Sequence, residues 1–250
     1  MIARQAKLII ACACSVQLAW AGDPSFKLTA GSYGINGGGQ TAARGLDVNL
    51  RNTSKLGNLW VGWYVQPAVN NDETTRQKQW RTGWDNTFNT GRVRVQPTLQ
   101  AASGGFWGAS FGVETGDTWY VGAGLGRTNL RPYVNLNFDP NDALMASGGY
   151  RWSAHQSLGF QWVRDNRLNP DQRHFHAIYR QGLSEHERVT FDVLSKAGSV
   201  TDSMGNVQKI SKLGLSATYD WHEKFVRLSY DPNANFGVQN MWRFSLGTRF

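Results

Sequence analysis

Residues 242–250 read WRFSLGTRF. Counted back from the last residue, every second side chain is apolar apart from one threonine: Phe250, Thr248, Leu246, Phe244 and Trp242. The side chains between them are small or basic: Arg249, Gly247, Ser245 and Arg243. Because successive side chains of a β-strand point to opposite faces, this period of two predicts a strand with one oily face and one charged face.

Such a strand suits a membrane β-barrel, in which one face meets lipid and the other meets a wet lumen. The stretch resembles the closing strand of bacterial outer-membrane β-barrel proteins of the porin-like class, which typically ends in Phe after alternating apolar residues. The resemblance implies that barrel-assembly machinery reads Trp242, Phe244, Leu246 and Phe250 as an insertion signal. The alternative is the last strand of a soluble antiparallel sheet that buries its oily face.

The first residues, Met1–Ala21, have the pattern of a cleaved secretory signal peptide. Arg4 and Lys7 precede a short apolar run, and Ala19-Trp20-Ala21 is a small-x-small cleavage pattern. We therefore predict two parts, a signal peptide at 1–21 and a transmembrane barrel domain at 22–250, with export to the outer membrane of a Gram-negative bacterium. A lipoprotein cleavage box ending at Cys12 is the competing interpretation.

Both cysteines, Cys12 and Cys14, lie in the segment predicted to be removed. Disulfides, cysteine–metal sites and cysteine nucleophiles are therefore not expected, and no cofactor or metal is predicted. No later segment approaches the ~20 apolar residues of a spanning helix. The mean hydropathy of −0.45 still permits a membrane barrel, because only alternate residues of its strands face lipid.

Glycine and tryptophan are abundant, at 28 and 11 residues. Amphipathic rings near strand ends are expected to form girdles at the membrane surfaces, although large aromatic residues equally suit a soluble core. The candidates for the girdles are Trp60, Trp63, Trp84, Trp119, Trp152 and Trp221.

About fifteen segments alternate with a period of two, separated by turn residues, and they predict one continuous antiparallel up-and-down barrel. Strands of ~9–11 residues with their connections make twelve strands the main prediction and fourteen the alternative, since such barrels have even strand numbers. The longest polar connections, predicted to be extracellular, are Asn70–Lys78, Asn166–Gln172 and Ala197–Asn206. The segments include Phe26–Asn36, Gly45–Asn52, Asn58–Gln66, Gln77–Phe88, 92–100, 107–114, 119–126, 131–138, 158–162, 175–179, 189–193, 213–219 and 226–230.

With the apolar rows facing outward, the inward rows are rich in arginine. Removing Arg4 and Lys7 lowers the formal charge from +8 to +6, still basic. Arginines along a narrow lumen would concentrate anions and grip carboxylates or phosphates, which predicts a small monomeric channel for anionic solutes. The alternative is a closed interior in which Asp47, Glu114 and Asp192 neutralise these arginines. The candidate lumen residues are Arg92, Arg94, Arg131, Arg180, Arg188, Arg227 and Arg243.

Two short stretches, Leu130–Leu136 and Gly149–Trp152, are similar to the small porins specific for oligogalacturonate and sialic acid. Those porins are twelve-stranded barrels of similar length that pass acidic sugars through basic lumens. The similarity covers about a tenth of the chain, and no substrate-binding residue is transferred from it.

Two further classes of function stay open. One is a lipid-modifying hydrolase on a barrel, for which Ser153 with His155 and Ser184 with His186 are the nearest serine–histidine pairs. These pairs fall at turns, so no catalytic residue is assigned and an enzyme is the less favoured prediction. The other is a structural or surface-binding barrel without transport. Nucleic-acid binding is not expected despite the pI of 9.7, because the arginines are scattered and an export signal is present.

Overall fold

The computed structural model describes residues 25–37, 40–68, 73, 76–126, 143–165, 171–202 and 204–250. The predicted signal peptide lies outside these residues, as do Arg131 and the predicted strand at 131–138. In the described part, no helix has the length and apolar character needed to cross a membrane.

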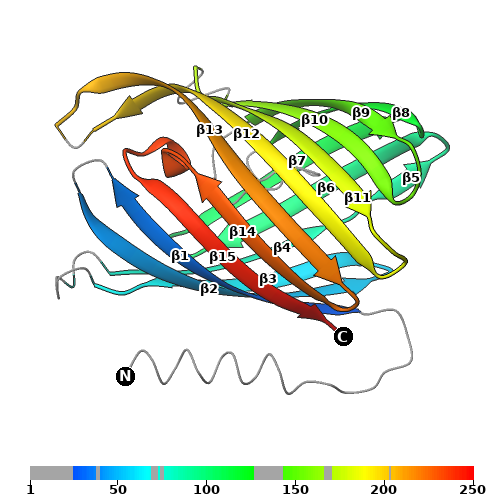
Figure 1. Cartoon of the computed structure of the whole chain (residues 1–250), viewed down its shortest axis with the longest axis horizontal. Coiled ribbons are helices and arrows are strands. Elements are labelled where there is room, and N and C mark those ends of the chain that lie inside the picture. Colours follow the sequence, from blue (N-terminus) through cyan, green and yellow to red (C-terminus); the bar gives the residue numbers. More distant parts are fainter. Residues whose placement is uncertain are drawn as a thin grey trace.

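Antiparallel strands form one sheet in which sequence neighbours are also spatial neighbours, as Figure 1 shows. Pairing of β1 with β15 and of β4 with β6 closes the sheet on itself. The strands are β1 (Phe26–Gly37), β2 (Gln40–Ser54), β3 (Gly57–Gln66), β4 (Gln77–Asp85), β5 (Phe88–Thr90), β6 (Val93–Ala102), β7 (Phe106–Thr115), β8 (Trp119–Gly126), β9 (Ala143–Arg151), β10 (Gln156–Asp165), β11 (Arg173–Gly182), β12 (Glu187–Thr201), β13 (Val207–Trp221), β14 (Lys224–Asp231) and β15 (Asn240–Arg249).

The short strand β5 extends β4 along the same partner. Asp85 pairs with Thr98 and Phe88 pairs with Val95, which is one unbroken register. The ladder is interrupted opposite Pro97, since proline has no backbone N–H to donate. The carbonyl of Pro97 still accepts a 3.2 Å hydrogen bond from the Asn86 amide. The described barrel wall therefore has fourteen strands plus this extension.

The main prediction of twelve strands is wrong, and the alternative of fourteen is right. The twelve-strand prediction assumed about nineteen residues for each strand together with its connection. Several connections have only two residues, such as 55–56, 91–92 and 222–223, so the chain completes more strands.

The barrel wall has apolar side chains on its outer face and polar side chains on its inner face, as the alternation predicts. This polarity is inverted relative to a soluble protein. Apolar side chains such as Trp107, 73% exposed, stand on the outer row, whereas Asp47 on the inner row is 2% exposed. Along β7 exposed and less exposed residues alternate at every position. A soluble sheet would bury its oily face, and this closed barrel presents that face to its surroundings. Trp242, Phe244 and Leu246 of β15 all lie on the exposed outer row.

Aromatic rings gather at the end of the barrel that holds the short turns. Trp119 and Trp152 both pack edge-on against Tyr150, with centroid distances of 4.5 and 5.1 Å. Phe250 stacks on Phe26 at 5.8 Å, beside the backbone hydrogen bonds that join these two residues. Trp60 departs from the girdle prediction: it stands on the inner row, over Gly83. A Cβ on Gly83 would lie 2.6 Å from the Trp60 ring.

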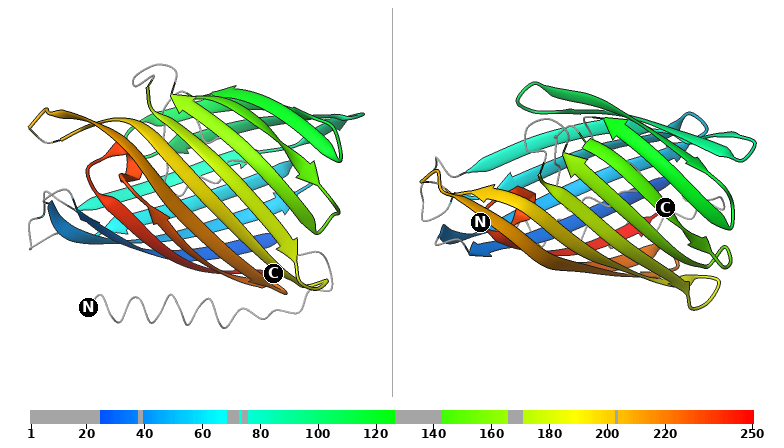
Figure 2. Two further views of the ribbon diagram at one scale, coloured as in Figure 1. Left: turned by 45° about the horizontal axis from the view of Figure 1, so that its top comes forward. Right: turned by 90° about the horizontal axis from the view of Figure 1, so that it is seen from above.

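The opposite end of the barrel carries the longer connections. There β12 and β13 form a hairpin that projects beyond its neighbours in Figures 1 and 2. The prediction that Ala197–Asn206 is a loop is wrong in part, because β12 continues to Thr201. This largely polar segment continues the antiparallel pairing of β12 with β13, with Ala197 opposite Ser211 and Thr201 opposite Val207.

Candidate pore interior

The inward rows carry more basic than acidic side chains. Among strand residues whose side chains the structure describes, the inward bases number twelve and the inward acids six. The bases are Lys27, Arg51, Arg81, Arg94, Arg151, Arg180, Arg188, Lys196, Lys212, Arg227, Arg243 and Arg249. The acids are Asp47, Asp85, Glu114, Asp192, Asp220 and Asp231.

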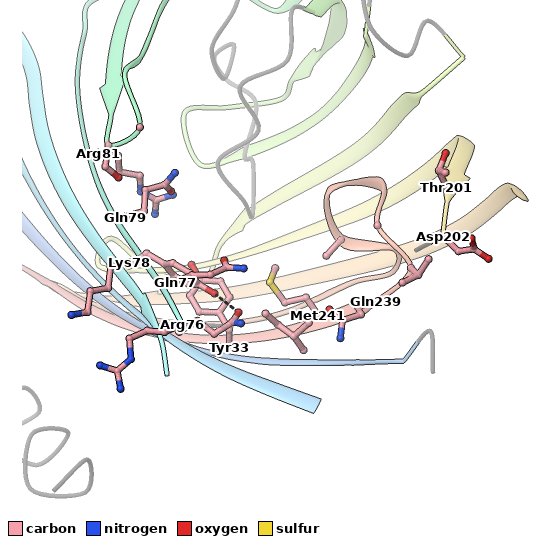
Figure 3. Close-up of a pocket in the computed structure, with 18 residues that line it drawn as sticks. Tyr33, Arg76, Gln77, Lys78, Gln79, Arg81, Thr201, Asp202, Gln239 and Met241 are labelled. Carbon is pink, nitrogen blue, oxygen red and sulfur yellow. Dashed lines mark hydrogen bonds between the residues drawn. The ribbon is translucent and has the colours of Figure 1, made fainter. Parts of the chain in front are cut away.

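A cavity of about 940 Å³ occupies the end of the interior that carries the longer connections. Tyr33 and Tyr64 meet edge to face in its wall, with a centroid distance of 5.6 Å. Figure 3 shows Tyr33 beside Met241, with Gln79 and Arg81 above them on β4. The cavity is large enough for a small solute with part of its hydration shell.

Asp47 lies under this cavity and joins strands that are distant in sequence. Its carboxylate accepts hydrogen bonds from Arg81 at 3.3 Å and from Arg243 at 3.0 Å. The guanidinium of Arg243 also lies 4.9 Å from the centre of the Tyr33 ring. Gly31 provides the space, since a Cβ there would overlap the Asp47 carboxylate.

Glu114 has the same bridging role on the other side of the barrel. Arg94 pairs with its carboxylate, and Arg151 donates to the same oxygen at 2.7 Å. The Arg151 guanidinium lies 3.7 Å from the centre of the Tyr120 ring, a cation–π contact. Asp117 lies 3.3 Å from Arg94 and adds a second carboxylate near the short-turn end.

The short-turn mouth contains a further cluster of cations. Asp220 accepts hydrogen bonds from Arg188 at 3.3 Å and from Arg249 at 2.5 Å. Lys27 and Arg227 lie over the buried ring of Phe225, at 4.3 and 6.0 Å from its centre. Four cations thus surround one carboxylate and one aromatic ring.

The connection between β14 and β15 folds against the inner wall. Its short helical turn η2 (Ala234–Phe236) places Phe236 in an apolar contact with Val200 and Ile210. The ring of His174 stacks parallel to that of Phe236, with a centroid distance of 5.0 Å. Buried Lys196 donates to Asp231 at 2.5 Å and to the backbone carbonyl of Asn233 at 3.1 Å.

His176 and Asp192 form a separate buried pair on β11 and β12. The Nδ1 atom of His176 donates to the Asp192 carboxylate at 2.9 Å. Asp192 therefore partners a histidine and not one of the predicted lumen arginines. Asp85 holds Arg51 at 3.2 Å and the Asn58 amide at 2.6 Å. Each of the six inward acids whose side chains are described therefore has a defined partner.

The predicted lumen arginines fall into several groups. Arg94, Arg188 and Arg243 are inward and paired with carboxylates, as the closed-interior alternative expects. Arg180 and Arg227 are inward and form no ion pair with a described carboxylate, although Arg227 donates to the Thr218 hydroxyl at 2.8 Å. The remaining two are not placed in the lumen wall: Arg131 lies outside the described residues, and Arg92 is exposed in the turn before β6.

Arg92 is therefore not part of a strand, because it ends the turn directly before β6, whose alternation it continued in the sequence. Sequence reasoning also missed inward cations, chiefly Arg51, Arg81, Arg151 and Lys196. The period-two pattern contains the signal for each of them. The signal was weak because Gly62 and Gly149 stand on the same inward rows and break their run of polar side chains.

The serines that suggested a hydrolase have roles in turns. Ser153 Oγ accepts the backbone amides of His155 and Gln156, each at 3.1 Å. Ser184 Oγ accepts the amide of His186 at 3.3 Å. Each serine closes its own turn. Among the described residues, no group of three or more metal-binding side chains gathers.

Comparisons with known proteins show the fold and leave the family open. No family model matches the chain, and no curated protein matches it. Among solved structures, the outer membrane protein Omp33 of Acinetobacter baumannii aligns with a TM-score of 0.50 at 9% identity, over 91% of this chain and 99% of that one.

Two other similar structures have lower TM-scores. OmpF of Salmonella typhi, in complex with daunomycin, gives a TM-score of 0.46 at 10% identity, over 90% of this chain and 97% of that one. The KdgM porin, also solved with disordered oligogalacturonate, gives 0.46 at 8% identity, over 89% of this chain and 99% of that one. The inverted polarity, the fourteen-strand closure and the alignment with Omp33 together give this chain the β-barrel fold of bacterial outer-membrane porins.

Proposed function

We propose that this protein is an outer-membrane channel that admits small anionic solutes. One observation carries the proposal: among the strand side chains that the structure describes, twelve bases and six acids face the interior of a closed barrel, which holds a cavity of about 940 Å³ at one end. The excess of six positive charges would raise the local concentration of anions inside a low-dielectric wall.

The position of the carboxylates supports an anion path instead of a fully neutralised interior. Glu114 serves two arginines, and Asp117 beside Arg94 is a second carboxylate, so that centre is balanced. Asp47 serves two arginines, so its centre keeps one positive charge in excess. At the short-turn mouth, Asp220 serves Arg188 and Arg249 in the same way. The Glu114 and Asp220 centres lie near the short-turn end, and the Asp47 centre lies between that end and the cavity. The Asp47 and Asp220 centres can each bind an anion weakly while the other attracts it onward.

We also propose an outer-membrane location, on the basis of the same architecture. The outer row offers lipid a continuous apolar surface, and the longer connections lie at one end only. Lipids and lipopolysaccharide of that membrane are then the surrounding partners. Recognition by the barrel-assembly machinery through Trp242, Phe244, Leu246 and Phe250 remains a prediction.

Single-channel recording in planar bilayers under a KCl gradient tests the function. We expect discrete currents whose reversal potential has the sign set by chloride. Arg180→Glu and Arg227→Glu each lower the inward excess from six to four charges, and each should move the reversal potential toward potassium. Arg92→Glu, in the exposed turn, is the matched control and should leave the reversal potential unchanged.

Currents that favour potassium, or reversal potentials that ignore Arg180 and Arg227, would contradict the proposal. Silent bilayers would favour a structural or surface-binding barrel. Altered lipid A or phospholipid profiles in cells that produce the protein would favour a lipid-modifying enzyme.

A further inference from the structure

The barrel wall has a gap beside β13, at the end that carries the longer connections. β13 begins at Val207, but β14 pairs with it only from Leu215 onward, and β14 ends at Asp231. Over residues 207–214, β12 is the only strand that pairs with β13 in the described part of the chain. Figure 1 shows this part of β13 rising away from the tops of β14 and β15. Strand pairing therefore closes the wall on one side of the segment and leaves it open on the other.

The gap lies at the level where apolar side chains give way to a charged one on the outer face. Leu213 and Leu215 of β13 are exposed, and Lys209, nearer the tip of the hairpin, is exposed as well. Across the gap, Trp242 of β15 is exposed and packs on Tyr230, with a centroid distance of 4.7 Å. Tryptophan and tyrosine favour the boundary between acyl chains and headgroups. In a membrane the gap would therefore open at that boundary.

The connection between β14 and β15, residues 232–239 and here called the strap, covers the gap from inside. Phe236 packs on Ile210 at the β12–β13 margin. Ala234 packs at the opposite margin, against the apolar cluster that contains Met241 of β15. The strap thus contacts both margins of the gap without pairing with either strand.

The strap is bonded largely to itself. The amide of Gly237 donates to the Ala234 carbonyl at 2.9 Å, and the Asn233 side chain donates to the Gly237 carbonyl at 2.8 Å. Asn233 and Phe236 have left-handed φ angles of 47° and 53°, which residues other than glycine keep only where contacts hold them. The Phe236 ring and the hydrogen bond from Lys196 to the Asn233 carbonyl hold the strap to the β12–β13 margin. A compact, strained unit with so few ties can move as a whole when the ring is released.

The cavity of about 940 Å³ lies directly behind the strap. Both margins of the gap contribute to its lining, Thr201 from the β12–β13 hairpin and Gln239 from the strap before β15, as Figure 3 shows. The β4 side of the cavity is polar, with Gln77, Gln79 and Arg81. A cavity that is apolar on one side and polar on the other suits an amphiphile. The apolar lining on the side of the strap and β1 is Tyr33, Ile35, Ala234, Val238 and Met241.

We propose that the gap is a lateral portal, closed by the strap, through which a single-chain amphiphile passes between the outer leaflet and the cavity. Release of Phe236 from Ile210 would let the strap swing toward the cavity. The apolar chain would then pass the edge of β13, whose unpaired backbone groups are tolerated in a membrane only where water or protein meets them. The inference rests on the outer-membrane location proposed above, and it does not depend on the anion path.

Palmitic acid that carries a diazirine in its chain tests the portal in liposomes that contain the exported protein, from which both native cysteines are predicted to be removed. After illumination, mass spectrometry should find adducts on Met241 inside the barrel as well as on Phe244 outside it. I210C/F236C, oxidised to a disulfide, should give about tenfold fewer interior adducts than the same variant reduced, because the lock removes the open population. F236A, which needs no disulfide, should give about tenfold more interior adducts than the wild type.

The matched control is A123C/A146C, a pair of cross-strand partners on the outer rows of β8 and β9. It should label alike when oxidised and when reduced, and heat-dependent gel migration shows that each variant is folded. Equal interior labelling of locked and reduced I210C/F236C would overturn the proposal, because the amphiphile would then enter through a mouth of the barrel. Interior labelling of F236A no greater than that of the wild type would overturn it as well. The reversal potential under a KCl gradient should not change with the lock, so failure of the portal and failure of the channel give different results.

Discussion

Replacing Lys196 with methionine should remove the support that holds the β14–β15 connection against the inner wall. The Lys196 side chain is 2% exposed and that of Asp231 is 6% exposed, and their charged atoms lie 2.5 Å apart. Removing one partner of a buried ion pair leaves the other charge without compensation, which costs about 3–5 kcal/mol. We therefore expect Lys196→Met to lower the free energy of unfolding by about 3–5 kcal/mol.

The same substitution also frees the backbone. Lys196 donates to the carbonyl of Asn233, and Asn233 and Phe236 have φ angles of 47° and 53°. Such left-handed conformations of residues other than glycine cost about 1–3 kcal/mol each and persist only where contacts hold them. Lys196→Met should therefore increase proteolytic cleavage within 232–239 and the noise of single-channel currents.

Urea unfolding of detergent-folded protein, followed by tryptophan fluorescence, measures the stability. Lys196→Met, Asp231→Asn and the double variant form a cycle. The double variant should be more stable than the sum of the single changes implies, by about 0.5–3 kcal/mol, because no charge is left unpaired. Lys212→Met is the control, since Lys212 is the exposed cross-strand partner of Lys196 and should change stability by about 0.5 kcal/mol or less. A loss below about 1 kcal/mol for Lys196→Met, or strictly additive losses, would refute the reasoning.

Two further predictions concern packing and pH. Gly149→Ala should destabilise the barrel by about 1–3 kcal/mol in the same urea assay, because the new Cβ would meet the Leu158 carbonyl and lie 2.6 Å from Tyr120 Oη. Gly34→Ala, where nothing lies within 4 Å, should not destabilise it, and equal losses at both positions would contradict this account. Asp202 caps the β12–β13 connection: the Asn206 side chain and backbone hold its pKa below the ordinary value of 3.8. A lowered carboxyl pKa adds stability above pH ~4 that is lost as pH falls through the folded value. Protection of residues 204–206 from hydrogen exchange, corrected for intrinsic rates, should follow this trend and be lost at every pH in Asp202→Ala.

The sequence by itself determined which way each strand faces. Side-chain direction in a strand alternates with every residue, so Trp242, Phe244 and Leu246 outside and Arg243 inside follow from local order alone. The closed barrel follows from the same pattern, because a sheet with an outer apolar row avoids exposed edges in a membrane only by closing.

Only the tertiary structure decided which residues meet. Asp47 holds Arg81 and Arg243, which lie 34 and 196 residues away in the chain, and those partners depend on the register and on the joining of β1 to β15. The strand count depended on turn length and on the interruption at Pro97, and neither changes the alternation that the sequence displays. Periodicity encodes the direction of a side chain, whereas its neighbour across the barrel is set by shear and closure, to which every strand contributes.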